Sequence, residues 1–93
     1  MRRIERTTQF KRDYRREKRA KHRTELDESL LQFIGWLVTD ARLPERARDH
    51  GLSGEWKDFR DCHIRPDLIL IYRKPDDETL QLVRLGSHSE LGL

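Results

Sequence analysis

The feature that most constrains the fold is the segment DLILIYRK, residues 67 to 74, which carries five consecutive apolar side chains from Leu68 to Tyr72. Successive side chains of a strand point to opposite faces of a sheet. An unbroken apolar run therefore predicts a strand whose two faces are both covered. Only 34% of the chain is hydrophobic, so we expect this strand at the centre of the fold.

Two further strands flank this central segment. Trp56 to Ile64 precedes it, and Arg65-Pro66 predicts a turn between the two because proline cannot donate to a neighbouring strand. Thr79 to Leu85 follows it, after a hairpin turn at residues 75 to 78. At the other end of the chain, residues 2 to 7 form a segment short enough for an edge strand.

Two helices are predicted between the first strand and the others. Residues 8 to 23 form the first, with a thin apolar seam because Phe10 and Tyr14 lie four positions apart. Thr24 opens the second helix, which ends at Leu43-Pro44. Its apolar residues recur with helical period: Leu26, Leu30, Phe33, Ile34, Leu37, Val38 and Ala41.

The predicted order is therefore β-α-α-β-β-β, and we expect an α+β protein with a single domain over residues 1–93. The predicted architecture is an antiparallel sheet with two helices packed on one face. The other face could remain open as a site. A domain of this size buries about two-thirds of its chain surface, so its stability is marginal unless a partner binds it.

The cellular compartment follows from what the sequence lacks. The single cysteine, Cys62, cannot form an internal disulfide, which suits a reducing cytosol. Alternation places it opposite Asp61 and His63, so we expect a buried structural thiol. The first ten residues lack an apolar signal-peptide core, and no segment approaches the roughly 20 apolar residues of a membrane span. We expect a soluble cytoplasmic protein with no membrane partner.

Charge is distributed unevenly along the chain. Residues 1 to 24 carry eleven Lys/Arg and three Asp/Glu, a net charge of +8, whereas residues 25 to 93 carry nine and fourteen, a net charge of −5. The basic part could attract a polyanion such as nucleic acid, or an acidic protein. The alternative is a solvated, charged helix surface, and charge alone does not decide between them.

Five side chains suited to proton transfer are predicted to converge at one end of the sheet. Asp61 and His63 are two positions apart on a strand and share a face, and the turn at Arg65-Pro66 returns the chain so that Asp67 approaches His63. One histidine lies just before these strands and another at their end. The complete set is His50, Asp61, His63, Asp67 and His88.

The chemistry of this set fits cleavage beside a phosphate. One histidine can remove a proton from an attacking hydroxyl while another protonates the leaving group, each role contributing roughly 10²–10⁴ in rate. Arg84, Arg60 or Lys57 could neutralise charge in the transition state. Simpler interpretations remain open: the histidines could be surface residues, Asp67 a turn residue, and Arg84 the partner of an acid on a neighbouring strand.

A metal site is the other specific interpretation. Asp61-x-His63 with Asp67 and His50 could bind a divalent ion. The spacing matches no strong metal signature, such as paired CxxC or HExxH. We therefore predict no metal and no cofactor.

The segment HGLSGEWKDFRDCHIRPDLILIYRK, followed by LQLVRLGSHSEL, resembles the YafQ branch of the RelE/ParE superfamily of bacterial toxins. The branch pattern is H-x-L-x-G-x-W, then R-D-x-H-x-x-P-D, then I-L-I-Y, then R-x-G-x-H. The resemblance covers residues 50 to 91, whereas residues 1 to 49 match mainly in layout. The matching positions are His50, Leu52, Gly54, Trp56, Arg60, Asp61, His63, Pro66, Asp67, Ile69, Leu70, Ile71, Tyr72, Arg84, Gly86 and His88.

The resemblance implies a RelE-like fold and a metal-independent endoribonuclease that cuts messenger RNA in the ribosomal A site. In that chemistry the RNA 2′-hydroxyl attacks the adjacent phosphate, giving a 2′,3′-cyclic phosphate and a 5′-hydroxyl. Carried over by position, His50 and His63 would share proton removal, with Asp61 and Asp67 assisting. His88 would protonate the leaving oxygen, and Arg84 would stabilise the phosphate.

The resemblance also implies partners. A small antitoxin with an acidic segment should bind and silence the toxin, and operator DNA would be reached only through the antitoxin. For the basic N-terminal part we predict phosphate contacts with ribosomal RNA through Arg12, Arg15 and Arg19. One feature departs from the family. The aromatic residue that follows the last histidine is absent from the end, Glu90-Leu91-Gly92-Leu93, which puts base stacking and codon preference in question.

Three other functions compete with this hypothesis. A ParE-like inhibitor of DNA gyrase belongs to the same superfamily, but that branch lacks the histidine set. A non-catalytic RNA-binding module would depend on the basic helix and not on Asp67 or His88. A ribonuclease acting on free RNA, or through a bound metal, would cleave without ribosomes or lose activity with a chelator.

Overall fold

The computed structural model describes residues 1–20 and 23–93, without the side chains of Arg23 and Thr24, so the predicted end of the first helix and start of the second lie partly outside the described residues. The elements are β1 (Arg3–Arg6), α1 (Thr8–Arg19), α2 (Arg23–Val38), η1 (Glu45–Ala47), β2 (His50–Gly51), η2 (Gly54–Trp56), β3 (Arg60–Arg65), β4 (Leu68–Arg73), β5 (Thr79–Gly86) and α3 (His88–Leu91). The α+β class and the order of the predicted elements are confirmed, with β2, α3 and the short 3-10 turns as additions.

The sheet has the strand order β1-β5-β4-β3-β2, so the apolar strand β4 is central as predicted. The pairs β2–β3, β3–β4 and β4–β5 are antiparallel. The sheet is mixed rather than wholly antiparallel, because β1 pairs with β5 in the parallel direction. The alternation pattern of a short strand contains no information about its partner, whereas the long connection through α1 and α2 makes a parallel pairing possible.

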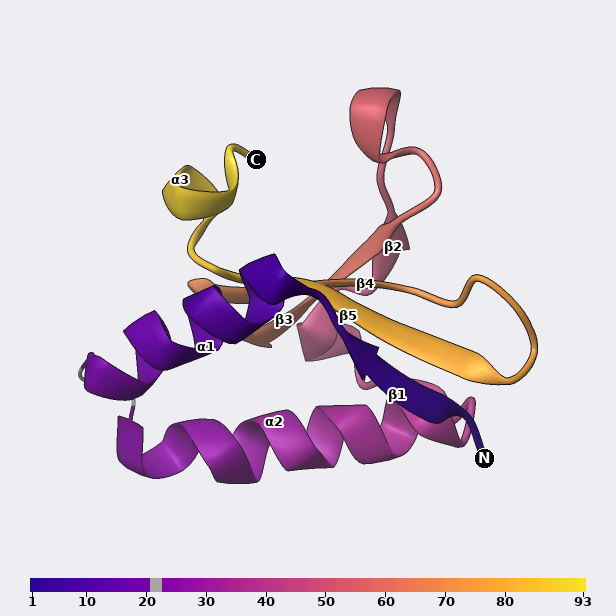
Figure 1. Ribbon diagram of the computed structural model, residues 1–93, viewed down its shortest axis with the longest axis horizontal. Helices are drawn as coiled ribbons and strands as arrows, with labels where there is room; N and C mark the ends of the chain where they lie inside the picture. Colours follow the sequence, from indigo (N-terminus) through magenta and orange to yellow (C-terminus); the bar gives the residue numbers. More distant parts are fainter. Residues whose placement is uncertain (21–22) are drawn as a thin grey trace.

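The two faces of the sheet have different cores. On one face, the even-numbered residues of β4 pack with α1 and α2, which run in opposite directions beside each other (Figure 1). On the other face, Ile69, Ile71 and Val83 pack with Leu91 of α3 and with the segment of residues 52 to 59. The two long helices therefore cover one face as predicted, and the second face is only partly open.

The boundaries of two elements differ from the predicted ones for local reasons. α2 ends at Val38 rather than near Leu43-Pro44, because Asp40 adopts a left-handed conformation with φ of 57°. The amide of Ala41 then donates to the Trp36 carbonyl at 2.9 Å, which closes the helix in a Schellman arrangement. β3 begins at Arg60 rather than at Trp56, since the preceding residues form the turn η2.

Among residues 1–20 and 23–93, no helix combines the length and the apolar composition that a membrane crossing requires.

Candidate active site

The register of the three central strands places the candidate residues in two rows on the face opposite α1 and α2. In the first row, Ile71 of β4 pairs with Asp61 on one side and Arg84 on the other. In the second row, Ile69 pairs with His63 and Gly86. Directly paired residues on antiparallel strands share a face. Asp61 and His63 therefore share a face, as predicted from alternation, and Arg84 lies on the same face.

His50 is held above Asp61 by the two-residue strand β2, whose register pairs these two residues. The Nδ1 of His50 lies 2.7 Å from the carbonyl oxygen of Arg48 and 3.1 Å from Oδ1 of Asp61. Only the carbonyl is aligned as a hydrogen-bond acceptor, so Asp61 Oδ1 has no hydrogen-bond partner among the described residues. A ring that donates through Nδ1 keeps the lone pair on Nε2, which is the form a general base needs.

Asp61 is the electrostatic centre of the site. It is 3% exposed, and burial raises its pKa, while the nearby His50, His63 and His88 partly offset this shift. A buried carboxylate oxygen without a hydrogen bond is unfavourable for folding. It would stabilise a neighbouring imidazole that takes up a proton during catalysis. Asp61 therefore has the properties of a functional group rather than of a structural one.

His63 and His88 face each other across the end of the sheet. Their ring centroids are 5.2 Å apart, and the planes cross at 62°. His88 is the first residue of α3, whose start is fixed by a capping box between Ser87 and Glu90. Its Nδ1 lies 3.7 Å from Oδ1 of Asp67 in the β3–β4 turn.

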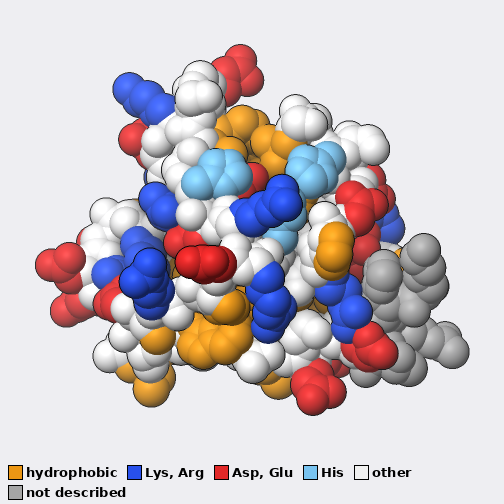
Figure 2. Space-filling view, turned by 180° about the vertical axis from the view of Figure 1, so that it is seen from behind, with side chains coloured by type: hydrophobic (Ala, Val, Ile, Leu, Met, Phe, Trp, Pro, Cys, Tyr) orange, Lys and Arg blue, Asp and Glu red, His pale blue; other side chains and the backbone are white. Residues whose placement is uncertain are grey.

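Figure 2 shows the histidine side chains gathered on one face of the molecule, with a basic side chain between them. His50, His63, Asp67 and His88 come from four separate segments, and Asp61 lies beneath them, so the structure brings the predicted set together. The roles of the individual residues stay predictions.

The three predicted phosphate-binding residues near the sheet have different surroundings. Arg84 forms two hydrogen bonds with the buried Asp13 of α1, at 2.7 and 3.3 Å. It therefore pairs with an acid, as one interpretation suggested, but from a helix rather than a strand. Arg60 lies in register with Tyr72 and bonds Asp49 at 3.3 Å, on the opposite face of β3 from Asp61. Lys57 follows η2 and is exposed.

The basic helix α1 carries two kinds of arginine. Arg12, Arg15 and Arg19, which we predicted to contact ribosomal RNA, are exposed. Arg16, in contrast, lies in a network with Asp13, Glu17 and Glu90. Part of the positive charge of this helix is therefore used inside the protein.

Two acids that were not among the predicted residues, Asp49 and Asp13, hold residues of the site in place. Asp49 accepts a hydrogen bond from the buried Tyr72 hydroxyl at 2.5 Å, which fixes the residue next to His50. Burial and this bond raise the pKa of Tyr72. Asp13 was detectable in principle, because it falls on the same helix face as Phe10, Tyr14 and Glu17. A charged residue on the apolar face of a helix indicates a specific buried partner.

Cys62 lies on the face of the sheet opposite to the histidines. Cys62 is free and fully buried on the helix-covered face, as predicted, and burial raises its pKa. Across the described residues, no three His, Cys, Asp or Glu side chains are grouped closely enough to hold a metal ion.

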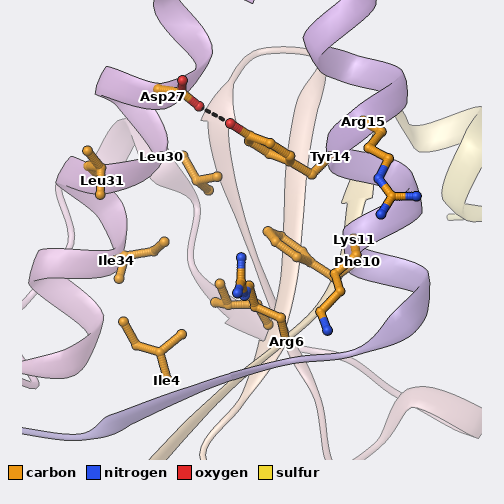
Figure 3. Close-up of a pocket in the computed structure, with 11 residues that line it drawn as sticks. Ile4, Arg6, Phe10, Lys11, Tyr14, Arg15, Asp27, Leu30, Leu31 and Ile34 are labelled. Carbon is orange, nitrogen blue, oxygen red and sulfur yellow. Dashed lines mark hydrogen bonds between the residues drawn. The ribbon is translucent and has the colours of Figure 1, made fainter.

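A cavity lined mostly by apolar side chains lies away from the histidines. It is an open groove of about 880 Å³ between α1, α2 and β1. Figure 3 shows Leu30, Leu31 and Ile34 of α2 on one side and Phe10 and Tyr14 of α1 on the other. The hydroxyl of Tyr14 donates to Asp27 at one end of the groove, and Arg6, Lys11 and Arg15 add positive charge. Its apolar lining suits a protein segment rather than proton-transfer chemistry.

A mixed sheet with a helical hairpin on one face is the α+β fold that this chain shares with solved YafQ structures, and it places the chain in the class of RelE-like toxins. Within that class the chain belongs to the YafQ family, described as the bacterial toxin of a type II toxin-antitoxin system, whose sequence model matches residues 2–92. The predicted resemblance to the YafQ branch is thus confirmed.

Related sequences include two from well-known bacteria. The mRNA interferase toxin YafQ of Escherichia coli strain K12 is 34% identical over 90 residues, which cover 95% of this chain and 97% of that protein. A putative toxin YafQ of Haemophilus influenzae is 42% identical over 66 residues, which cover 68% of this chain and 65% of that protein. The second match therefore spans slightly less than two-thirds of the relative.

Solved structures share the fold over nearly the whole chain. A copper-bound mutant toxin from Helicobacter pylori is 35% identical with a TM-score of 0.85, covering 98% of this chain and 99% of that one. The E. coli DinJ-YafQ complex contains a chain that is 32% identical with a TM-score of 0.79, covering 98% of both chains.

Proposed function

We propose that this protein is a ribosome-dependent mRNA endoribonuclease that inhibits translation as the toxin of a type II toxin–antitoxin pair. The observation that carries the proposal is the convergence of His50, His63 and His88 above the buried Asp61. The E. coli relative bears the name mRNA interferase toxin, and an mRNA interferase is an endoribonuclease. The protein would act in the cytoplasm, where ribosomes translate.

The proposed reaction needs a base, an acid and a cation. The Nδ1 of His50 donates to the Arg48 carbonyl, so Nε2 is free to remove the proton of the RNA 2′-hydroxyl, a role that His63 would share. The 2′-oxygen attacks phosphorus, and the bond from phosphorus to the 5′-oxygen breaks. His88, oriented by Asp67 on its Nδ1 side, would give that oxygen a proton from Nε2. Arg84 would balance the charge that develops on the phosphate.

A metal-dependent alternative is suggested by similar structures from H. pylori, which include a copper-bound mutant toxin and a metal-bound toxin. In the described part of this chain, no group of three or more candidate ligands is close enough for a metal. The donor set therefore does not fit a metal in this arrangement, and we derive no step through one.

Primer extension on a defined mRNA tests the proposal. The purified chain would be incubated with the mRNA, with and without programmed 70S ribosomes, in the presence and absence of a chelator. We expect in-frame cuts only with ribosomes, unchanged by the chelator. Cuts in free RNA, or loss of cutting with the chelator, would favour the alternative nucleases. Binding to ribosomes or to gyrase without any cut would favour a non-catalytic inhibitor.

We further propose that the groove between α1 and α2 receives the antitoxin. Relatives of this chain form the DinJ-YafQ toxin–antitoxin complex. The groove offers an apolar lining with Arg6, Lys11 and Arg15, which complements an amphipathic segment with acidic residues. Leu31 on its border is 68% exposed and Ile4 of β1 is 45% exposed, so the groove presents contiguous apolar surface of the kind that a partner covers.

A further inference from the structure

Along the edge of β5 that faces α1, side chains and not a neighbouring strand form the hydrogen bonds with the backbone of Val83 and Leu85. β1 pairs with β5 only as far as Leu82. Beyond it, the Thr7 hydroxyl donates to the Val83 carbonyl at 2.7 Å, and the Leu85 amide donates to Oδ2 of Asp13 at 3.0 Å. Arg16 donates to the Leu85 carbonyl at 2.8 Å. α1 therefore satisfies the strand edge just where β5 approaches the candidate active site.

Asp13 is the centre of this contact. It is 2% exposed and accepts hydrogen bonds from Arg84, from the Leu85 amide and from Arg16 Nη1, the last at 3.0 Å. Burial by itself would raise the pKa of this carboxyl, but Arg84, the Leu85 amide and Arg16 together hold it below its ordinary value. Asp13 is thus a buried anion with two cationic partners, an arrangement that folding alone does not require.

A β-bulge directs Arg84 to the site. Ile71 pairs with Arg84 whereas the next residue, Tyr72, pairs with Leu82, so Val83 is the extra residue on β5. A bulge changes the direction of the side chains that follow it. Arg84 consequently shares a row with Asp61 across two strand spacings, or about 10 Å. Asp13 engages Nε and Nη2 of Arg84, and among the described contacts Nη1 has no partner.

The same network reaches the segment that carries His88. Arg16 Nε lies 3.1 Å from Oε2 of Glu90, and Oε1 of Glu90 accepts the Ser87 amide at 2.9 Å. Gly86 makes this approach possible. A Cβ at that position would lie 2.7 Å from Arg16 Nη2 and 3.1 Å from Glu90 Oε1. The glycine of the R-x-G-x-H motif therefore has a structural reason, which is to admit the Arg16–Glu90 pair.

We propose that Asp13 is a positioning residue, which fixes the Arg84 guanidinium so that Nη1 faces the scissile phosphate. Arg16 supports Asp13 in this role, because it binds both Asp13 and Glu90 of α3. The inference rests on the proposed function, because it assigns Arg84 to the phosphate. It adds that α1 orients the catalytic face from the other side of β5. A guanidinium held in place stabilises developing charge without reorganising, which is the basis of electrostatic catalysis.

A double-mutant cycle tests this proposal, with kcat and KM of ribosome-dependent cleavage measured for each variant. We expect Asp13→Asn to lower kcat about tenfold or more with little change in KM. In an Arg84→Lys background, which lacks the planar fork, Asp13→Asn should cost far less. An equal cost in both backgrounds would overturn the proposal. Asp40→Asn is the matched control, because Asp40 also binds two cations, Arg2 and Lys74, but at the opposite end of β4 and β5.

A second measurement separates this proposal from the proposed function. The Nε–H resonance of Arg84 in ¹⁵N-labelled protein reports the Asp13 bond without any substrate. We expect a protected resonance that moves towards the free-arginine position in Asp13→Asn. An unchanged resonance would overturn the positioning role even if the wild type cleaves mRNA. A wild type that does not cleave, with the expected shift, would refute the nuclease function and leave the orientation of Arg84 established.

Should Asp13→Asn not fold, Arg16→Lys provides the same test at a partly exposed position. It keeps the positive charge but cannot form all the bonds to Asp13, Glu90 and the Leu85 carbonyl. We expect a smaller shift of the Arg84 resonance and a severalfold fall in kcat, with KM retained. If neither the resonance nor kcat changes, the network does not position Arg84.

Discussion

The hydroxyl of Tyr72 donates a hydrogen bond to Asp49 at 2.5 Å, and so a core residue of β4 holds the neighbour of His50. Tyr72 points to the face covered by the helices, whereas His50 sits over Asp61 on the other face. Arg60 binds the same carboxylate at 3.3 Å. The short strand β2 is therefore anchored from the face opposite to the one that carries the candidate chemistry.

This anchor leads to the first prediction. Tyr72→Phe should lower the free energy of unfolding by about 1.5–3 kcal/mol, the range for a hydrogen bond to a charged group. It should also lower kcat, because His50 would lose its fixed position, and urea denaturation and single-turnover cleavage measure the two effects. Tyr14→Phe is the control, since Tyr14 also donates to an aspartate, Asp27, but beside the groove. Equal losses of kcat in both variants would contradict the prediction.

His88→Ala should abolish growth arrest without changing the fold. Half of the His88 side chain is exposed, and the capping box of α3 is formed by Ser87 and Glu90, so the substitution leaves the packing intact. Removal of the acid that protonates the leaving group should lower the cleavage rate by roughly 10²–10⁴. Growth after induction and circular dichroism are the measurements. Full toxicity of a folded variant would exclude His88 from the mechanism.

The substitutions Asp13→Asn and Asp61→Asn should change the melting temperature of the protein in opposite directions. Burial raises the pKa of Asp61, so its folded form binds a proton more tightly than the unfolded chain, and its ionisation destabilises the fold as pH rises through its unfolded value of 3.8. Asp61→Asn should therefore raise the melting temperature at pH 7 while reducing cleavage. The gain should disappear below about pH 4.

The pKa of Asp13 lies below its ordinary value, so its ionisation stabilises the fold, whereas the ionisation of Asp61 destabilises it. Its ionised form stabilises the fold above pH 3.8, and this contribution is lost as pH falls through the lowered folded pKa. Asp13→Asn should consequently lower the melting temperature at pH 7. Melting curves of both variants, recorded at several pH values, test these two predictions. A change of the same sign at pH 7 would show that one of the two environments is misassigned.

Charge reversal at Arg12, Arg15 and Arg19 should weaken binding to ribosomes and reduce its dependence on salt. Each phosphate contact that is lost should lower the salt slope by about 0.7–0.9. Reversal at the exposed Arg3 and Arg42, which lie outside α1, serves as the control. Binding would be followed by sedimentation at increasing salt, and an unchanged slope would exclude α1 as the phosphate-binding element.

Leu31→Asp should weaken the complex with the cognate antitoxin. The substitution removes apolar area at the border of the groove and adds a negative charge that repels an acidic segment. Calorimetric titration would show a higher Kd, and the melting temperature of the free toxin should stay close to that of the wild type, because the side chain is exposed. An unchanged Kd would place the antitoxin on another surface.

The position of the central strand and the faces on which several side chains lie could be predicted from the alternation of apolar residues and from the residues typical of turns. The unbroken apolar run of β4 determined the central strand, and alternation in β3 placed Asp61 and His63 on one face. The turn at Arg65-Pro66 predicts that Asp67 approaches His63, whereas the contact that the structure shows for Asp67 is with His88, whose Nδ1 lies 3.7 Å from Oδ1 of Asp67. The central strand and the shared face of Asp61 and His63 depend on neighbours in sequence, so the sequence alone suffices for them, whereas the contact of Asp67 with His88 depends on the tertiary structure.

Contacts between distant segments could not be predicted in the same way. The parallel pairing of β1 with β5, and the bonds of Tyr72 with Asp49 and of Asp13 with Arg84, join residues that are far apart along the chain. Nor does a local pattern indicate the bulge at Val83, because its direction depends on the strand beside it. The amino-acid sequence by itself therefore determined which residues could do the chemistry, through types and spacings. Only the tertiary structure decided which groups hold them in place, since a buried charge takes its partner from whichever segment packing brings within hydrogen-bond distance.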